Sequence, residues 1–265
     1  MTGAARHPAY GQVRPVTPYA SVVLAPNPSP MTLEGTNSWV LRAPGGRRSV
    51  VVDPGPDDPG HLATLAGTGP VALILLTHGH ADHAAGAAGL HTLTGAPVRA
   101  VDPAHRIDGA GLADGDVVTI DGLDMTVQAT PGHTADSVCL VVEDSVLTGD
   151  TILGRGTTVV AHPDGRLGDY LDSLRRLAAL GPRRVLPGHG PEQPDVAEVA
   201  AAYLAHRIER LDQVRAAVEA HPGPVTAREI VDTVYADVDP AVRWAAELSV
   251  RAQLDYLASD QPGES

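Results

Sequence analysis

Three histidines and one aspartate stand within six residues, directly after the apolar run 71–76: His78, His80, Asp82 and His83. Imidazole nitrogens and carboxylate oxygens are ligands that zinc prefers in proteins. A rigid strand that ended here would deliver these side chains into a loop. The alternate spacing lets His78 and His80 point one way while Asp82 and His83 point another. Two adjacent metal ions need such an arrangement, so the spacing predicts a two-metal site.

Three further ligand candidates follow other predicted strands. His133, Asp150 and His189 each lie next to a glycine, which permits tight backbone geometry near a site. Any one of them alone could be an ordinary turn residue that bonds to the backbone. Because such residues recur at strand ends, we interpret them together as one metal centre. Its candidate ligands are His78, His80, Asp82, His83, His133, Asp150 and His189.

Apolar runs separated by turn signals predict the elements that position these residues. Strands paired with intervening helices throughout indicate a layered α/β fold up to about residue 192. We expect helices after Asp57-Asp58-Pro59, over 83–94 and over 168–180. The predicted strands are 21–24, 38–41, 49–52, 71–76, a short one near 98, 117–120, 125–129, 137–142, 146–147 and 184–186.

The C-terminal part of the chain has a helical pattern instead. One long helix is expected over 195–220, and a Pro- and Gly-rich breaker follows it at 221–224. Thr226 and Glu229 form a capping-box pattern that opens a second helix to about Tyr235, and a third runs from 239–240 to about Ala258. We therefore predict a catalytic domain over 1–202 and a small, mostly helical domain over 203–265.

Composition and charge limit the partners. The chain has 265 residues with a formal net charge of −13, which disfavours non-specific binding to nucleic acids or anionic membranes. Its one cysteine, Cys139, excludes an intrachain disulfide. No signal-peptide pattern and no apolar run of membrane-spanning length occur, so we expect a cytoplasmic protein without a membrane partner. All 19 basic residues are Arg, which, with the many Ala, Gly and Pro, is typical of a high-GC bacterial genome.

The spacing His-x-His-x-Asp-His, followed by His, Asp and His at later strand ends, resembles the pattern of the metallo-β-lactamase superfamily. The resemblance implies a four-layered αββα sandwich that holds two Zn²⁺ or another divalent metal. The implied ligands of the first metal are His78, His80 and His133. Those of the second are Asp82, His83 and His189, and Asp150 would bridge both.

The chemistry expected of such a site is hydrolysis. A water that bridges two zinc ions loses a proton near neutral pH and becomes the nucleophile, while the metals polarise the substrate oxygen. The implied catalytic residues are Asp82, which orients this hydroxide, and Asp150, which bridges the metals. Asp53 and Thr77 are candidates to support the ligands through hydrogen bonds.

Three stretches indicate a branch of the superfamily. Residues 27–37, 148–159 and 203–207 are similar to the β-lactamase-like protein 2 group, whose C-terminal domain is winged-helix-like. Characterised members of that group act as endoribonucleases on single-stranded RNA. The resemblance therefore implies a phosphodiesterase or endoribonuclease-like hydrolase that acts on single-stranded RNA or a related ester.

Other functions stay open. A glyoxalase II-like thioester hydrolase shares the same metal ligands, a β-lactamase is a third reading, and a non-catalytic, metal-stabilised binding module is a fourth. Residues 203–265 contain six Arg against eleven Asp and Glu, so this domain lacks the basic stripe that duplex DNA binding needs. We expect no double-stranded DNA partner, and assign packing or homodimerisation to this domain.

Overall fold

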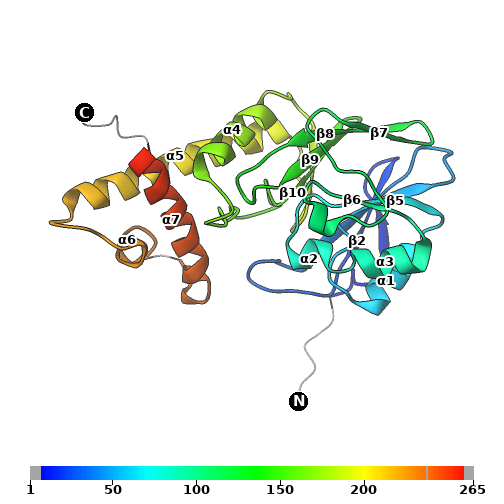
Figure 1. The fold of residues 1–265 in the computed structure, drawn as a ribbon, viewed down its shortest axis with the longest axis horizontal. Helices are drawn as coiled ribbons and strands as arrows, with labels where there is room; N and C mark the ends of the chain where they lie inside the picture. Colours follow the sequence, from blue (N-terminus) through cyan, green and yellow to red (C-terminus); the bar gives the residue numbers. More distant parts are fainter. Residues whose placement is uncertain (1–6, 237, 260–265) are drawn as a thin grey trace, which may run out of the picture.

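The computed structural model describes residues 7–236 and 238–259 and contains two β-sheets, which lie on the right of Figure 1, with the C-terminal helices on the left. The first sheet has the strand order β1-β2-β3-β4-β5-β6, with β4, β5 and β6 parallel and the other neighbours antiparallel. Its strands are β1 Val13–Pro15, β2 Ala20–Leu24, β3 Asn37–Leu41, β4 Ser49–Val52, β5 Val71–Leu75 and β6 Val98–Arg99. The Pro-rich β1 was not predicted.

The second sheet has the order β11-β10-β9-β8-β7, in which only the pair β10 and β11 is parallel. All of these strands were expected within a few residues of their observed ends. They are β7 Val117–Ile120, β8 Leu123–Ala129, β9 Val138–Val142, β10 Ser145–Gly149 and β11 Arg184–Pro187.

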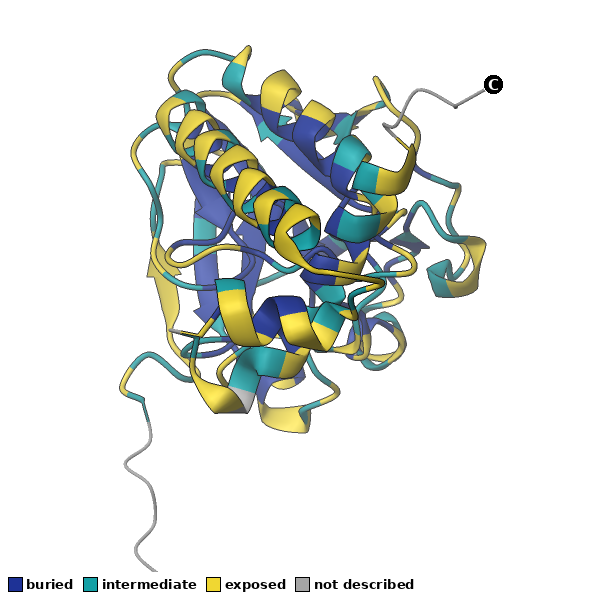
Figure 2. Cartoon of the chain, turned by 90° about the vertical axis from the view of Figure 1, so that its left-hand side faces the viewer, coloured by how far each residue is buried: buried dark blue, intermediate teal, exposed yellow. Residues whose placement is uncertain are grey.

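Three apolar layers separate four layers of secondary structure. Trp39, Leu75, Met125 and Leu140 belong to the core that joins strands of the two sheets. On the outer face of the first sheet, α1 (Pro59–Ala66) and α3 (Ala87–Thr94) pack over β5, and on that of the second, α4 (Leu167–Ala178) packs over β9 and β10. Figure 2 shows the buried strands covered by helices whose outer faces are exposed. The predicted αββα sandwich is therefore confirmed.

One predicted helix is divided in two. The single helix expected over 83–94 is α2 (Ala81–Ala84) followed by α3. The amide of Gly86 donates to the carbonyl of Gly55 at 2.8 Å, and the amide of Gly55 donates to the carbonyl of His83 at 3.0 Å. These contacts to the loop after β4 replace helical hydrogen bonds, so the segment that carries Asp82 and His83 is held by its neighbour.

Helices make up the C-terminal part of the described chain: α5 Val196–Ala220, α6 Ala227–Val234, the 3-10 turn η2 Pro240–Val242 and α7 Arg243–Ser259. The predicted capping box of Thr226 and Glu229 is present at the start of α6. Helix α5 runs without a break through the predicted boundary between residues 202 and 203, and that boundary stays a prediction. The outer ends of the two predicted domains, residues 1–6 and 260–265, lie outside the described residues. Within the described chain, no helix has the length and apolarity that crossing a membrane requires.

Candidate metal centre

The seven candidate ligands meet at one end of the sandwich. They follow the carboxyl ends of β5, β8, β10 and β11, which come from both sheets. Backbone hydrogen bonds join the sheets here, because the amide of Asn37 donates to Gly188 O at 2.8 Å and that of Val138 donates to Thr77 O at 2.8 Å. The loops that carry the ligands are therefore held together by regular backbone bonds.

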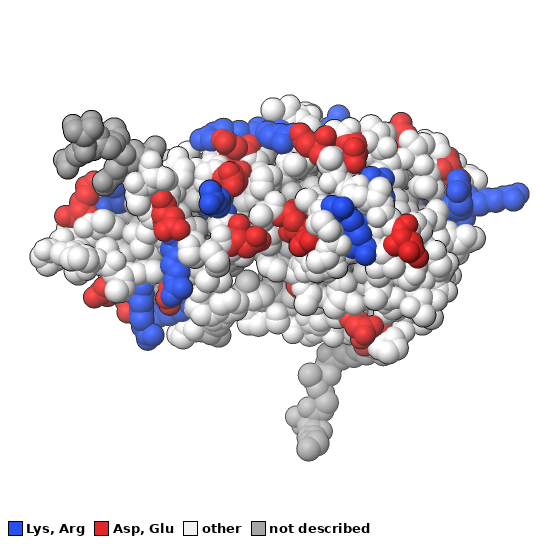
Figure 3. All heavy atoms as spheres, viewed as in Figure 1, with Lys and Arg blue, Asp and Glu red and all other residues white. Residues whose placement is uncertain are grey.

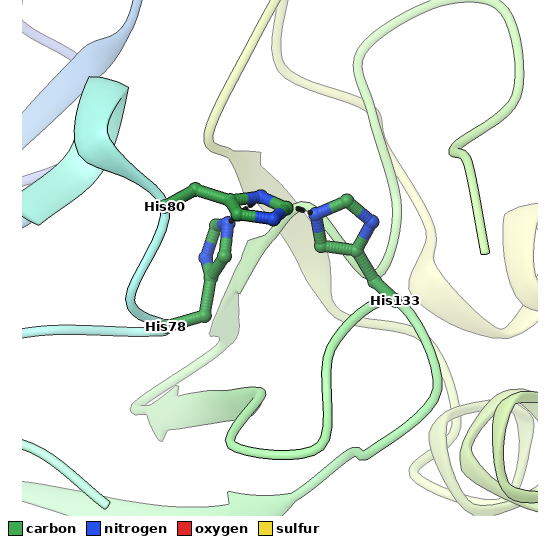
Figure 4. Close-up of side chains that lie close together, drawn as sticks. All are labelled: His78, His80 and His133. Carbon is green, nitrogen blue, oxygen red and sulfur yellow. Dashed lines mark hydrogen bonds between the residues drawn. The ribbon is translucent and has the colours of Figure 1, made fainter. Parts of the chain in front are cut away.

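His78, His80 and His133 form the first cluster (Figure 4). The Nδ1 atom of His80 lies 3.1 Å from His78 Nε2 and 3.0 Å from His133 Nε2. The His78 and His133 rings are almost fully buried, whereas His80 is half-buried. The three rings point toward one another from two loops that are about fifty residues apart in the sequence.

Asp82, His83 and His189 form the second cluster. The Nε2 atoms of His83 and His189 are 3.1 Å apart, and Asp82 Oδ2 lies 3.1 Å from His189 Nε2 and 3.5 Å from His83 Nε2. Both histidines are buried, but the Asp82 side chain is 31% exposed. The Asp82 carboxylate is therefore more exposed to solvent than those of Asp150 and Asp53.

Asp150 lies between the two clusters. Its Oδ1 is 3.3 Å from His83 Nε2 and 3.4 Å from His189 Nε2, while its Oδ2 is 3.8 Å from His133 Nε2. One carboxylate oxygen thus faces each cluster, as a bridging ligand requires.

Hydrogen bonds outside the clusters fix which ring nitrogen faces inward. Thr77 Oγ1 donates to Asp53 Oδ2 at 2.7 Å and accepts from His78 Nδ1 at 3.0 Å. His83 Nδ1 donates to the same Asp53 oxygen at 2.9 Å, and the amide of Thr77 donates to Asp53 Oδ1 at 2.8 Å. Asp53 and Thr77 therefore orient two of the histidines, as the sequence predicted.

Backbone carbonyls orient the histidine rings of two other ligands. His133 Nδ1 donates to Val159 O at 2.6 Å, and His189 Nδ1 donates to Gly35 O at 3.2 Å. No sequence pattern marks these partners, since any residue supplies a carbonyl. Asn37, from the same stretch as Gly35, donates to Pro187 O and Gly190 O and so holds the His189 loop from both sides.

The donor set fits metal ions. The Nδ1 atoms of His83 and His189 donate elsewhere, so in the neutral rings both Nε2 atoms carry lone pairs that face each other at 3.1 Å. Asp150 Oδ1 is buried and makes no hydrogen bond. Buried acceptors without donors are costly, and a divalent cation would satisfy all of them. Metal-bound histidine typically donates its second N–H to a carboxylate or carbonyl, as these do.

The electrostatics of the centre also favour positive charge. Burial alone would lower the pKa of His83, but Asp150 and Asp53 raise it well above its ordinary value. Against the effect of burial, Asp150 and Asp82 raise the pKa of His189 to about 9. Burial would raise the pKa of Asp150, yet His189 and His83 hold it well below its usual range. The Asp150 carboxylate is thus ionised and draws cations to the site.

Glycines next to the ligands allow the close packing that their positions predicted. Gly149 has a φ of 47°, and a Cβ there would lie 2.5 Å from Thr77 Oγ1. A Cβ on Gly188 would lie 2.7 Å from Asp150 Oδ1. Any side chain at either position would displace a residue of the centre.

A cavity of about 260 Å³ opens onto the centre at His133 and Asp150. It lies between the loops at the ends of the two sheets and the C-terminal helices, and more than half of its lining residues are apolar. The apolar side chains are Pro30, Met31, Leu33, Leu153, Val159, Val238, Val242, Ala245 and Ala246, with the ring of Tyr235.

Helix α5 holds the loop that borders this cavity. The Tyr203 hydroxyl donates to Gly156 O at 2.8 Å and lies 3.2 Å from the amide of Leu153, and Arg207 donates to Thr158 O. Thr158 Oγ1 in turn donates to Asp150 O at 2.5 Å. The stretch 203–207 resembles the β-lactamase-like protein 2 group, but the sequence alone predicts no role for Tyr203 or Arg207. The one sequence feature that could have indicated this role is the presence of a Tyr and an Arg four residues apart, and so on one face of the long helix.

This fold and site define the class of the protein, and comparison with known families agrees. Residues 31–189 match the metallo-β-lactamase superfamily, and residues 226–261 match the β-lactamase-associated winged helix domain. The chain belongs to the metallo-β-lactamase superfamily, whose members are generally hydrolases, and carries a C-terminal winged helix domain.

Individual relatives span nearly the whole chain. It is 33% identical to a β-lactamase-like protein 2 homolog of Caenorhabditis elegans, over 96% of this chain and 90% of that protein. It is 30% identical to an atrochrysone carboxyl ACP thioesterase of Aspergillus chevalieri, over 97% and 86% respectively.

Solved structures have the same fold. A β-lactamase domain protein from Burkholderia ambifaria superposes with a TM-score of 0.80 at 24% identity, over 98% of this chain and 92% of that one. TTHA1623, solved in a di-iron-bound form, superposes with a TM-score of 0.55 at 28% identity, over 67% of this chain and 96% of that one.

Proposed function

We propose that the protein is a two-metal hydrolase of thioesters or esters that have an apolar acyl group. The observation that carries the choice of substrate is the apolar cavity that opens onto His133 and Asp150. A relative of 30% identity is named an acyl-carrier-protein thioesterase, which supports the same class. Of the substrates that the sequence left open, the thioester is therefore the first candidate and single-stranded RNA the second.

The charged residues around the cavity make RNA the less favoured substrate. Arg155, on the cavity wall, pairs with Glu34 at 2.5 Å, and Arg207 donates to the Thr158 carbonyl. Single-stranded RNA binding uses a basic groove and stacked aromatic rings. On the face drawn in Figure 3, acidic and basic side chains of the described residues are interspersed, without a continuous basic track.

Each residue of the centre has a distinct part in this mechanism. One metal ion would be held by His78, His80 and His133. The other would be held by Asp82, His83 and His189, and Asp150 would bind both ions. Bound divalent ions supply a water of lowered pKa and polarise the scissile carbonyl. Imidazole nitrogens and carboxylate oxygens are donors that zinc prefers, which supports zinc as one such ion. The di-iron form of TTHA1623 makes iron the second metal to test.

The protein groups position and transfer protons around the reacting carbonyl. Hydrogen bonding to His189 outweighs burial and lowers the pKa of Asp82, so its exposed carboxylate is ionised and can orient a water and accept its proton. The apolar cavity would hold the acyl group next to His133 and exclude competing water. The acyl group would thus be fixed while its carbonyl faces the two clusters.

The proposal is tested with protein loaded with zinc, and separately with iron, and with metal content measured. The substrates are an acyl N-acetylcysteamine thioester, S-lactoylglutathione, bis(p-nitrophenyl) phosphate, single-stranded RNA and a chromogenic β-lactam. We expect the acyl thioester to give the highest kcat/KM. Higher activity on RNA, or none on any ester, would refute the proposal.

Asp82→Asn provides the first prediction. Asparagine keeps the size of the side chain but removes the charge that accepts a proton, so we expect turnover to fall by at least about 10²-fold. His80→Ala should abolish turnover as well, because it removes a ligand. Full activity in either variant, at verified metal content, would contradict the assignment of this centre.

A further inference from the structure

One face of the C-terminal helices forms a wall of the cavity. Val242, Ala245, Ala246 and Ser249 all line it, and their spacing of three and four residues places them on one side of η2 and α7. Ser249 Oγ accepts a hydrogen bond from the amide of Val160 at 3.3 Å, which ties α7 to the loop beside the metal centre.

The opposite wall comes from the catalytic domain. Met31 and Leu33, in the loop before β3, and Leu153, after β10, face the cavity. The cavity thus extends from His133 and Asp150 at one end to the small side chains of α7. Its volume of about 260 Å³ is close to the lower end of the range of roughly 300–1,000 Å³ for small-molecule sites.

We propose that this face of the winged helix domain binds the alkyl chain of the acyl substrate and sets its length. The inference rests on the proposed thioester hydrolysis and adds a role for the C-terminal domain in substrate choice. Two alanines, Ala245 and Ala246, leave space where larger side chains would fill the cavity. On this wall Val242, Ala245 and Ala246 offer methyl groups, and the Ser249 hydroxyl already accepts a hydrogen bond from Val160, so the wall matches a hydrocarbon chain rather than a sugar or a phosphate. The two arginines on the other walls are engaged, Arg155 by Glu34 and Arg207 by the Thr158 carbonyl.

Chain-length dependence is the expected result. Burial of one methylene group contributes a factor of about four in binding, so kcat/KM should increase by at least about tenfold from S-acetyl- to S-octanoyl-N-acetylcysteamine. Ala246→Leu should reduce the ratio of octanoyl to acetyl kcat/KM by about tenfold, because its side chain occupies the space of the distal methylenes. Calorimetry should show correspondingly weaker octanoate binding to the metal-free variant.

A matched control keeps the test specific. Ala258→Leu makes the same substitution on the exposed face of α7 and should leave the ratio unchanged. Val242→Ala, which widens the cavity, should shift the preference to longer chains, and it provides an independent test if Ala246→Leu folds poorly in circular dichroism.

The two proposals fail in different ways. Hydrolysis of the acetyl and octanoyl thioesters at equal rates, or an unchanged ratio in both cavity variants, would overturn the role of α7 and leave the thioesterase proposal standing. Absence of thioester hydrolysis by the metal-loaded protein, with octanoate binding that Ala246→Leu weakens, would overturn the proposed function alone. Absence of both would overturn both.

Discussion

Asp53 shows how one residue outside the ligand clusters determines their geometry. Its carboxylate accepts three hydrogen bonds, two from Thr77 and one from His83. It also has a φ of 52°, a conformation that Asp and Asn tolerate better than most residues. Asp53 therefore couples the end of β4 to ligands of both clusters.

Asp53→Asn tests this coupling without changing size or backbone preference. The amide cannot accept all three hydrogen bonds, so the inward orientation of His83 is lost in part. We expect metal affinity to fall by about 10- to 100-fold, measured by competition with a chromophoric chelator. Asp121→Asn is the matched control, since Asp121 also has a positive φ, of 50°, but pairs with Arg48 at the surface. Equal affinities in the two variants would contradict the role of Asp53.

Among the elements, α1 contains a buried histidine with a consequence for pH dependence. His61 is 3% exposed, and its Nε2 lies 2.8 Å from Ser38 Oγ, so α1 is joined to β3. Burial lowers the pKa of His61 to about 4, in spite of the nearby Asp58 carboxylate. In the unfolded chain the same ring has an ordinary pKa of about 6.5.

Proton binding to His61 determines how the stability of the protein depends on pH. Between the two pKa values the unfolded chain binds the proton and the folded chain does not, so stability decreases as the pH falls through this window. As the pH falls from about 7.5 to about 5, His61 lowers the free energy of unfolding by about 2 kcal/mol. Urea unfolding of His61→Gln should show a free energy of unfolding whose pH dependence is weaker than that of the wild type by this amount. An equal pH dependence in the two proteins would rule out the contribution of His61.

At the scale of the whole molecule, α5 joins the winged helix domain to the metal centre. Tyr203 and Arg207 bind carbonyls of the loop that leads from Asp150 to Val159. The C-terminal helices therefore support the candidate site as well as the cavity beside it.

Tyr203→Phe tests this support. It removes one hydroxyl and leaves Gly156 O and Leu153 N without their partner, which should lower the free energy of unfolding by about 1–3 kcal/mol. Chemical denaturation provides the measurement. Tyr256→Phe is the control, because the Tyr256 hydroxyl makes no hydrogen bond within the described chain, and its stability should be unchanged. A similar loss in both variants would show that the hydrogen bonds of Tyr203 contribute little.

The elements and the candidate ligands could be predicted from sequence because their signals are local. Apolar runs such as 71–76 and the glycines beside His133, Asp150 and His189 reflect burial and backbone geometry within a few residues. The dense group from His78 to His83 has few explanations other than metal binding. The division of the helix over 83–94 at Gly86 was not predictable in this way, because the contact that interrupts it comes from Gly55.

Only the tertiary structure decides how the ligand clusters are oriented and what lies beside them. The carbonyls of Gly35 and Val159 fix two histidine rings, and no side-chain pattern marks a carbonyl that serves this purpose. The apolar cavity likewise depends on residues from the N-terminal loop, the strand ends and α7, which are more than two hundred residues apart in the sequence. Sequence thus determined the chemistry that the chain can perform. Long-range packing decided the surroundings of that chemistry, because a cavity belongs to no single segment.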